Sequence, residues 1–209
     1  KTFEDLKLIK PLLKVVSETG YSKPTPIQSL VIPAILSGKD VMASSITGSG
    51  KTAAFLLPIL QRFYRSTAVN YCRVLIVTPT RELAIQCYEN FNVLNKYVGL
   101  DACLVIGASS VQKQESQLRN FPEVVIATPG RLLDLLTNSM SFGLENLQML
   151  VFDEADKLLE MGFESEIKEI LSYLNGEMQT LLFSATMGGS IDKLAAMSMR
   201  KPIRLSADP

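Results

Sequence analysis

The sequence predicts an α/β fold, a doubly wound and mostly parallel β-sheet with helices on both faces. Six short β-rich runs alternate with longer amphipathic stretches along the 209 residues, and the runs lack a strict alternation of apolar and polar residues. Strands that are covered on both faces have this character, and helical crossovers are the simplest connection between parallel strands. With 47% hydrophobic residues, the chain is long enough to bury the core of one compact domain.

The segment before the first strand is expected to form an amino-terminal unit of residues 1–38. A helical pattern runs from Asp5 to Glu18, and Pro24-Thr25-Pro26 then makes a rigid bend. The bend could hold Tyr21 flat against a planar ring, while the Gln28 amide, with one acceptor and two donors, matches the edge of an adenine. A capped helix with a packed tyrosine is the alternative interpretation.

The first strand, expected over residues 40–43, leads into a phosphate-binding loop. Residues 45–52 read Ser-Ile-Thr-Gly-Ser-Gly-Lys-Thr. The glycines would let backbone N–H groups close around a phosphate chain, Lys51 would add a point charge, and the Thr52 hydroxyl would reach a magnesium ion. The strict pattern has Gly in place of Ser45, which is small enough to keep the turn. An ordinary turn is the alternative, and the acidic run described below disfavours it.

Two later strand ends share the pattern Thr-Pro-x-Arg. The strand expected over residues 73–77 is followed by Thr78-Pro79-Thr80-Arg81, and the strand over 124–127 by Thr128-Pro129-Gly130-Arg131. Thr can cap a helix, Pro suits the first helical position, and the free N–H groups with an Arg favour an anion. Because the carboxyl ends of parallel strands meet at one edge of the sheet, we predict two phosphate-binding sites at that edge. Plain helix capping is the alternative.

The remaining strands are expected over residues 102–106, 149–152 and 180–183. The second of them precedes Asp153-Glu154-Ala155-Asp156, and the third precedes Ser184-Ala185-Thr186. Carboxylates packed so closely raise one another's pKa unless a metal or a donor offsets the repulsion. We therefore predict that a cation lies at the acidic run. The hydroxyls of the last run could bridge to its final carboxylate, with a structural cap as the alternative.

The composition narrows the possible chemistry. The chain has no His, which excludes His general bases and His-ligated zinc, and its 21 basic and 21 acidic residues leave no net charge to attract polyanions. Cys72, Cys87 and Cys103 are odd in number and widely spaced, so we expect reduced thiols inside a cell. No apolar run approaches the roughly 18 residues of a membrane span. We therefore expect an intracellular domain without a membrane partner, monomeric in isolation.

Together these motifs resemble those of the DEAD-box RNA helicases, within the superfamily 2 helicases. The resemblance runs from Phe3 to about Arg204 and includes six motifs in the family's order. It implies a single RecA-like domain over residues 1–209, with its core sheet in residues 39–209, that forms the first half of a two-domain helicase core. It also implies ATP and Mg²⁺ as cofactors, with RNA and the second RecA-like domain of the parent chain as partners.

The resemblance further implies a role for each motif. ATP would be held by eight residues: Tyr21, Gln28, Thr47, Gly48, Ser49, Gly50, Lys51 and Thr52. RNA would be touched by eight others: Pro79, Thr80, Arg81, Gly107, Thr128, Pro129, Gly130 and Arg131. Catalysis would rest on Lys51, Asp153 and Glu154, with Thr52 and Asp153 as magnesium ligands and Glu154 acting on the attacking water. Asp156, Ser184 and Thr186 would couple the nucleotide state to RNA, and Phe3 would pack on the adenine segment.

The chain departs from the family's pattern in three respects, the smallest of which is Ser45 where the family usually has Ala. Gly107-Ala108 stands where the family often has paired glycines, which weakens the case for one close backbone approach to RNA. The sequence also stops before any second RecA-like domain, so we expect it to be a piece of a longer protein that lacks the arginine fingers. A finger is worth about a thousandfold or more in rate. The isolated domain should therefore bind nucleotide and turn it over poorly.

The resulting hypothesis is a parent ATP-dependent RNA helicase that opens short duplexes or remodels RNA–protein complexes. The likeness to the family implies ribosome biogenesis as one setting, with the nucleus or nucleolus as one possible compartment and the cytoplasm as another. A GTPase is the first alternative, but Asn95-Lys96-Tyr97-Val98 lacks the final Asp of a guanine-reading tetrapeptide. A superfamily 2 DNA translocase is the second, disfavoured by the Gln28 segment and the Ala-Asp ending of the acidic run. An inactive RNA-binding scaffold is the third, disfavoured because Lys51, Asp153 and Glu154 are intact.

Overall fold

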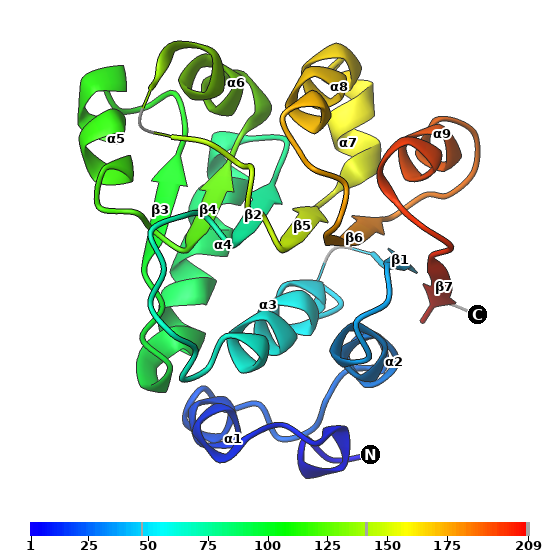
Figure 1. The fold of residues 1–209 in the computed structure, drawn as a ribbon. Helices are drawn as coiled ribbons and strands as arrows, with labels where there is room; N and C mark the ends of the chain where they lie inside the picture. The colour runs from blue at the N-terminus through cyan, green and yellow to red at the C-terminus, as the bar shows by residue number, and fades with distance from the viewer. Residues whose placement is uncertain (47, 141, 208–209) are drawn as a thin grey trace.

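The computed structural model describes residues 1–46, 48–140 and 142–207 and confirms the predicted α/β class. Within that part of the chain, seven strands form one sheet in the order β3-β4-β2-β5-β6-β1-β7, and every pairing is parallel. Helices lie on both faces of this sheet (Figure 1). The chain crosses from β1 over two strand positions to β2 and reaches one border of the sheet at β3. The strands β4, β5 and β6 then fill the positions in between, and β7 forms the other border beside β1.

Six of the seven strands are the predicted ones. The strands are β1 (Val41–Ser44), β2 (Val74–Val77), β3 (Ala102–Val105), β4 (Val124–Ala127), β5 (Met149–Phe152), β6 (Gln179–Ser184) and β7 (Ile203–Ser206). The seventh strand, β7, was not predicted; it pairs with β1 and forms one border of the sheet. Its residues alternate between half-buried and exposed, as expected for a border strand.

The helices confirm the expected pattern except at the amino terminus. They are the 3-10 helix η1 (Glu4–Leu6), α1 (Lys10–Glu18), α2 (Pro26–Leu36), α3 (Lys51–Arg62), α4 (Arg81–Leu94), the 3-10 helix η2 (Asn95–Tyr97), α5 (Val111–Leu118), α6 (Pro129–Asn138), α7 (Ala155–Glu160), α8 (Glu164–Ser172) and α9 (Gly189–Ser198). The single helix predicted over residues 5–18 is wrong. Lys7 adopts a left-handed conformation with φ 61°, and Pro11 fits only the first turn of a new helix.

Separate apolar layers cover the two faces of the sheet. One layer lies under α1 to α4 and includes Phe55, Phe91 and Phe183, whereas the other lies under α6 to α9 and includes Phe152 and Leu132. Successive residues of each central strand point into opposite layers, so both must be apolar. This explains why the strand sequences lack an apolar–polar alternation. The three cysteines are free and buried in these layers.

The strand register brings the motif-bearing corners to one edge of the sheet. Val77 of β2 pairs with Ala127 of β4 and with Phe152 of β5, and Phe152 in turn pairs with Leu182 of β6. The residues that follow these strand ends therefore leave the sheet side by side. Among the described residues, no helix combines the length and the apolar character needed to cross a membrane.

Candidate active site

The phosphate loop ends in a helix start that is shaped for an anion. Gly48 and Gly50 have φ of 84° and 86°, a left-handed backbone that glycine adopts readily, and Gly50 is the N-cap of α3. The free N–H groups of a helix's first turn favour negative charge. The buried hydroxyl of Ser49 has no hydrogen-bond partner among the described residues. Thr47, also assigned to this site, lies outside the described residues.

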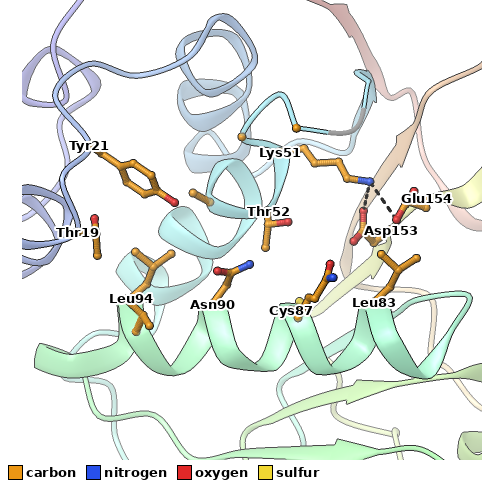
Figure 2. Close-up of a pocket in the computed structure, with 15 residues that line it drawn as sticks. Thr19, Tyr21, Lys51, Thr52, Leu83, Cys87, Asn90, Leu94, Asp153 and Glu154 are labelled. Carbon is orange, nitrogen blue, oxygen red and sulfur yellow. Dashed lines mark ion pairs between the residues drawn. The ribbon is translucent and has the colours of Figure 1, made fainter.

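An ion-pair cluster closes the end of the cleft beyond the loop. Lys51 Nζ lies 2.9 Å from Asp153 Oδ1 and 3.7 Å from Glu154 Oε2, and all three residues are buried (Figure 2). Glu154 Oε1 in turn lies 3.1 Å from Nζ of the exposed Lys157. Part of the positive charge that we predicted beside the acidic run is therefore provided by Lys51 and Lys157.

Burial is the main electrostatic feature of Asp153. It raises the pKa of this carboxyl, Lys51 opposes the rise, and the charge of Glu154 adds to it to a smaller extent. Repulsion between neighbouring carboxylates, from which we predicted a cation, therefore contributes to the rise but is not its largest cause. Asp156 is half-buried and makes its contacts away from the other two. A carboxylate that is costly to bury ionised is a good ligand for an incoming divalent cation.

The donor set fits Mg²⁺ arriving with a nucleotide. Thr52 and Asp153 line the same cleft, and Mg²⁺ in such sites takes one or two protein oxygens together with waters and substrate phosphates. Among the described residues there is no group of three His, Cys, Asp or Glu side chains that could hold a metal alone. Glu154 is held beside this position with φ 50° and ψ 55°, a left-handed conformation unusual for a residue other than glycine.

The Gln28 segment is attached to the back of the phosphate loop. Gln28 and Thr25 form a capping box, in which Gln28 Oε1 accepts from the Thr25 N–H at 3.0 Å. Gln28 Nε2 donates to the Gly50 carbonyl at 3.0 Å. A Cβ on Gly50 would lie 2.7 Å from Gln28 Nε2 and 2.9 Å from Thr25 Oγ1. Gln28 is buried behind the loop and does not line the cleft, so its contact with adenine stays a prediction.

A cleft of about 360 Å³ joins the predicted parts of the site. Thr19 and Tyr21 lie at one end, with Tyr21 45% exposed, and Asp153 and Glu154 lie at the other (Figure 2). The long wall is a face of α4 that was not predicted to take part: Leu83, Gln86, Cys87, Asn90, Val93 and Leu94. Their spacing is that of any buried helix face. The available signal was the pair of amides, Gln86 and Asn90, that interrupts this face at a spacing of four.

The first Thr-Pro-x-Arg corner presents an unengaged arginine. Thr80 caps α4, because its hydroxyl accepts from the Leu83 N–H at 3.1 Å, while Pro79 precedes the helix. Arg81 is exposed, and its side chain makes no ion pair or hydrogen bond within the described part of the chain. This corner can therefore offer its guanidinium to a phosphate.

The second corner is built differently from the first, and a phosphate-binding site at each corner stays a prediction. Pro129 begins α6, and Thr128 stands at its N-cap without a side-chain capping bond. Arg131 donates to the Ser109 carbonyl at 2.7 Å and to Gln114 Oε1 at 3.0 Å, which ties α6 to the loop before α5. Near this corner, Gly107 and Gly130 are exposed. Because they have no side chains, they would let a bound chain come close to the protein backbone.

Comparison with known proteins decides the family. The DEAD/DEAH box helicase family model matches residues 25–194, which is most of the chain. The chain belongs to the DEAD/DEAH box helicase family. A DEAD-box ATP-dependent RNA helicase 28 from Oryza sativa subsp. japonica is 50% identical over 209 residues, covering 100% of this chain and 26% of that protein. An ATP-dependent RNA helicase DRS1 from Kluyveromyces lactis is 47% identical over 211 residues, covering 100% and 28%.

A solved structure agrees with the sequence relatives. The crystal structure of a DEAD box protein from the hyperthermophile Methanococcus jannaschii has a TM-score of 0.92 and 34% identity, covering 99% of this chain and 56% of that one. The predicted RecA-like fold is confirmed by this match. The chain spans about a quarter of the length of the two curated helicases named above.

The predicted coupling residues of this helicase-family domain meet between α7 and the end of β6. The Thr186 hydroxyl donates to Asp156 Oδ2 at 3.4 Å, whereas the Ser184 hydroxyl donates to the Thr186 carbonyl at 2.6 Å. Only one of the two hydroxyls therefore bridges to the acidic run, and the other fixes the turn that carries it. Phe3, expected to pack on the adenine segment, is buried in the same apolar cluster as Ile27 of α2.

Proposed function

We propose that the chain is the ATP-binding domain of an ATP-dependent RNA helicase whose parent protein couples ATP hydrolysis to unwinding of RNA duplexes or remodelling of RNA–protein complexes. The observation that carries the proposal is the buried Lys51–Asp153 ion pair at the closed end of a cleft that a phosphate loop borders. Membership of the helicase family and its ATP-dependent relatives support the substrate and the reaction.

ATP would lie along the cleft with its phosphates on the loop. The N–H groups at the start of α3 would hold the phosphate oxygens, and Lys51 would exchange its contact with Asp153 for a contact with the β and γ phosphates. Asp153, released from this lysine, and the Thr52 hydroxyl would hold Mg²⁺. When bound, the ion supplies positive charge that offsets the charge developing on the transferred phosphoryl group. Gly50 and Gln28 would keep the loop in place meanwhile.

Glu154 would act on the attacking water. Its carboxylate lies next to Asp153 at the cleft's end, where one oxygen faces Lys51 and the other faces Lys157. A carboxylate oxygen in this place can accept a hydrogen bond or a proton from water. Because the residue is held in a left-handed conformation at the start of α7, its carboxylate has a fixed place relative to Asp153.

RNA would bind at the carboxyl edge of the sheet, across the corners that follow β2 and β4. Arg81 would supply a charged contact, while Gly107 and Gly130 would admit the backbone and Arg131 would hold α5 and α6 at the right separation. The turn after β6 would report the nucleotide state through Thr186 and Asp156. Contacts of this kind read the phosphate chain and not the base sequence. A second RecA-like domain of the parent would complete the site. The setting in ribosome biogenesis, the cellular compartment and the monomeric state of the isolated domain stay predictions.

The test uses the parent protein with Glu154→Gln. We expect ATP to bind with nearly unchanged affinity while RNA-stimulated ATP hydrolysis falls by about a hundredfold or more, because the water loses its acceptor. Glu164→Gln is the matched control, since Glu164 is exposed on α8 and pairs with Lys168 of the same helix. A parent ATPase that does not respond to RNA would overturn the helicase assignment.

A further inference from the structure

The α4 wall of the cleft carries a side-chain amide that has no hydrogen-bond partner in the described part of the chain. Asn90 lines the cleft between Cys87 and Leu94 of α4 (Figure 2), and its side chain is exposed and makes no hydrogen bond to another described residue. Gln28, the amide assigned to the base, is instead held by Thr25 and Gly50. Asn90 is thus an amide that faces the cleft with both its donors and its acceptor available.

The position of Asn90 along the cleft specifies which part of a nucleotide it would meet. Lys51 and Thr52 mark the phosphate end, and Tyr21 marks the opposite end (Figure 2). On α4, Asn90 follows Leu83 of the phosphate end by seven residues, about 10 Å at the rise of an α-helix, and precedes Leu94 by one turn. In a nucleotide that spans the cleft, the ribose lies between the phosphates and the base.

We propose that Asn90 hydrogen-bonds the ribose hydroxyls and so favours ribonucleotides over deoxyribonucleotides. The proposal rests on the proposed function, because it requires ATP in this cleft. A carboxamide can accept from one hydroxyl and donate to the other, which suits the adjacent 2′ and 3′ hydroxyls of a ribose. A site built to pair with a hydroxyl loses affinity for an analogue without it, because the amide is then left unpaired.

Asn92 provides a matched control on the same helix. It is the same residue type, it is exposed, and it does not line the cleft, because two residues along a helix point to nearly opposite sides. Asn90→Ala and Asn92→Ala therefore carry the same change in helix propensity and side-chain volume. Circular dichroism and the midpoint of thermal unfolding would establish that both variants fold as the unmodified chain does.

The experiment measures binding of ATP and 2′-deoxy-ATP to the chain by calorimetry in the presence of Mg²⁺. The unmodified chain and Asn92→Ala are expected to bind ATP about three- to tenfold more tightly than 2′-deoxy-ATP, the range for one net hydrogen bond. Asn90→Ala should bind ATP more weakly by that factor and bind the two nucleotides equally. In a thermodynamic cycle the loss of Asn90 and the loss of the hydroxyl would then not add.

Two results would overturn the inference in distinguishable ways. If the unmodified chain binds ATP and Asn90→Ala weakens both nucleotides equally, or neither, Asn90 does not recognise the 2′ hydroxyl while the proposed function stands. If Asn90→Ala lowers the affinity for ATP and for 2′-deoxy-ATP equally, but lowers the affinity for GTP less, Asn90 contacts the base instead. If the unmodified chain binds no ATP, the proposed function fails together with the inference.

Discussion

The two ends of the cleft differ in how far the protein organises them before a nucleotide binds. At the phosphate end, Lys51 and Asp153 are buried and paired, and Gly50 is fixed to Gln28. At the base end, Tyr21 is 45% exposed, and Asn90, which lies between the two ends, has no partner among the described residues. A buried charge without a partner is costly, whereas an exposed ring or amide is solvated by water. When a nucleotide binds, the phosphate end must therefore exchange one ion pair for another, whereas the base end only loses contact with water.

The largest expected effect comes from removing the charge at the phosphate end. Lys51→Ala should lower ATP affinity by more than about a hundredfold, because truncating one member of a buried charge pair costs several kcal/mol. The measurement is calorimetric titration with ATP and Mg²⁺. Lys51→Met, which retains most of the side-chain volume, serves as a second variant in case the alanine variant unfolds. Lys168→Ala, at an exposed lysine of α8, is the control; an equal loss in this control would contradict a specific role for Lys51.

A smaller loss is expected at the base end. Tyr21→Ala should weaken ATP binding by about fivefold to a hundredfold, the range for one aromatic ring stacked on a base. Tyr21→Phe keeps the ring and should bind ATP like the unmodified chain. If Tyr21→Phe and Tyr21→Ala weaken binding equally, the hydroxyl rather than the ring makes the contact, and stacking at this end is contradicted.

The link between the Gln28 segment and the loop predicts a stability effect. Gly50→Ala would place a Cβ 2.7 Å from Gln28 Nε2, in addition to the strain of a left-handed alanine. Gly38 has a similar φ of 90° and open space around it, so Gly38→Ala carries the strain alone. Gly50→Ala should lower the free energy of unfolding by about 1–3 kcal/mol more than Gly38→Ala. Urea denaturation measures both, and equal losses would show that the two segments are not tightly packed.

The smallest expected effect is a dependence of stability on pH. Because the pKa of Asp153 is raised above 3.8 in the folded chain, the folded state keeps this proton to higher pH than the unfolded state does. The stabilisation is present below pH 3.8 and is lost as the pH rises through the raised pKa. Relative to Asp153→Asn, the unmodified chain should become progressively less stable over that window. Urea denaturation of both proteins across the window tests this, and a relative gain in stability with rising pH would contradict it.

The parts of the molecule that could be predicted from the sequence are those that a local pattern of residues determines. Strands such as Val74–Val77 are apolar throughout because both faces are covered, and the motif after each strand is recognisable without knowing its neighbours. The border strand Ile203–Ser206 was missed, because four residues of weak alternation at the end of a sequence are not distinctive. The break at Lys7 was missed because the apolar spacing continues through it.

The parts of the site that sequence could not predict depend on tertiary contacts. Gln28 and Gly50 are 22 residues apart, and nothing local shows that the amide is used by the loop. Arg81 and Arg131 occupy the same place in the same pattern, yet only the second is bound by a neighbouring loop. Asn90 belongs to a helix face whose spacing is that of an ordinary core helix. In each case the partner in space, and not the residue itself, determines the role.

A crystal structure of the chain with a non-hydrolysable ATP analogue and Mg²⁺ tests the central claim most directly, because it compares the two ends of the cleft in one experiment. The expected result is that Lys51 Nζ has left Asp153 for the phosphate oxygens, that Asp153 faces Mg²⁺, and that the base lies against Tyr21. A nucleotide bound elsewhere, or one bound in the cleft while the 2.9 Å contact between Lys51 and Asp153 persists, would contradict this account.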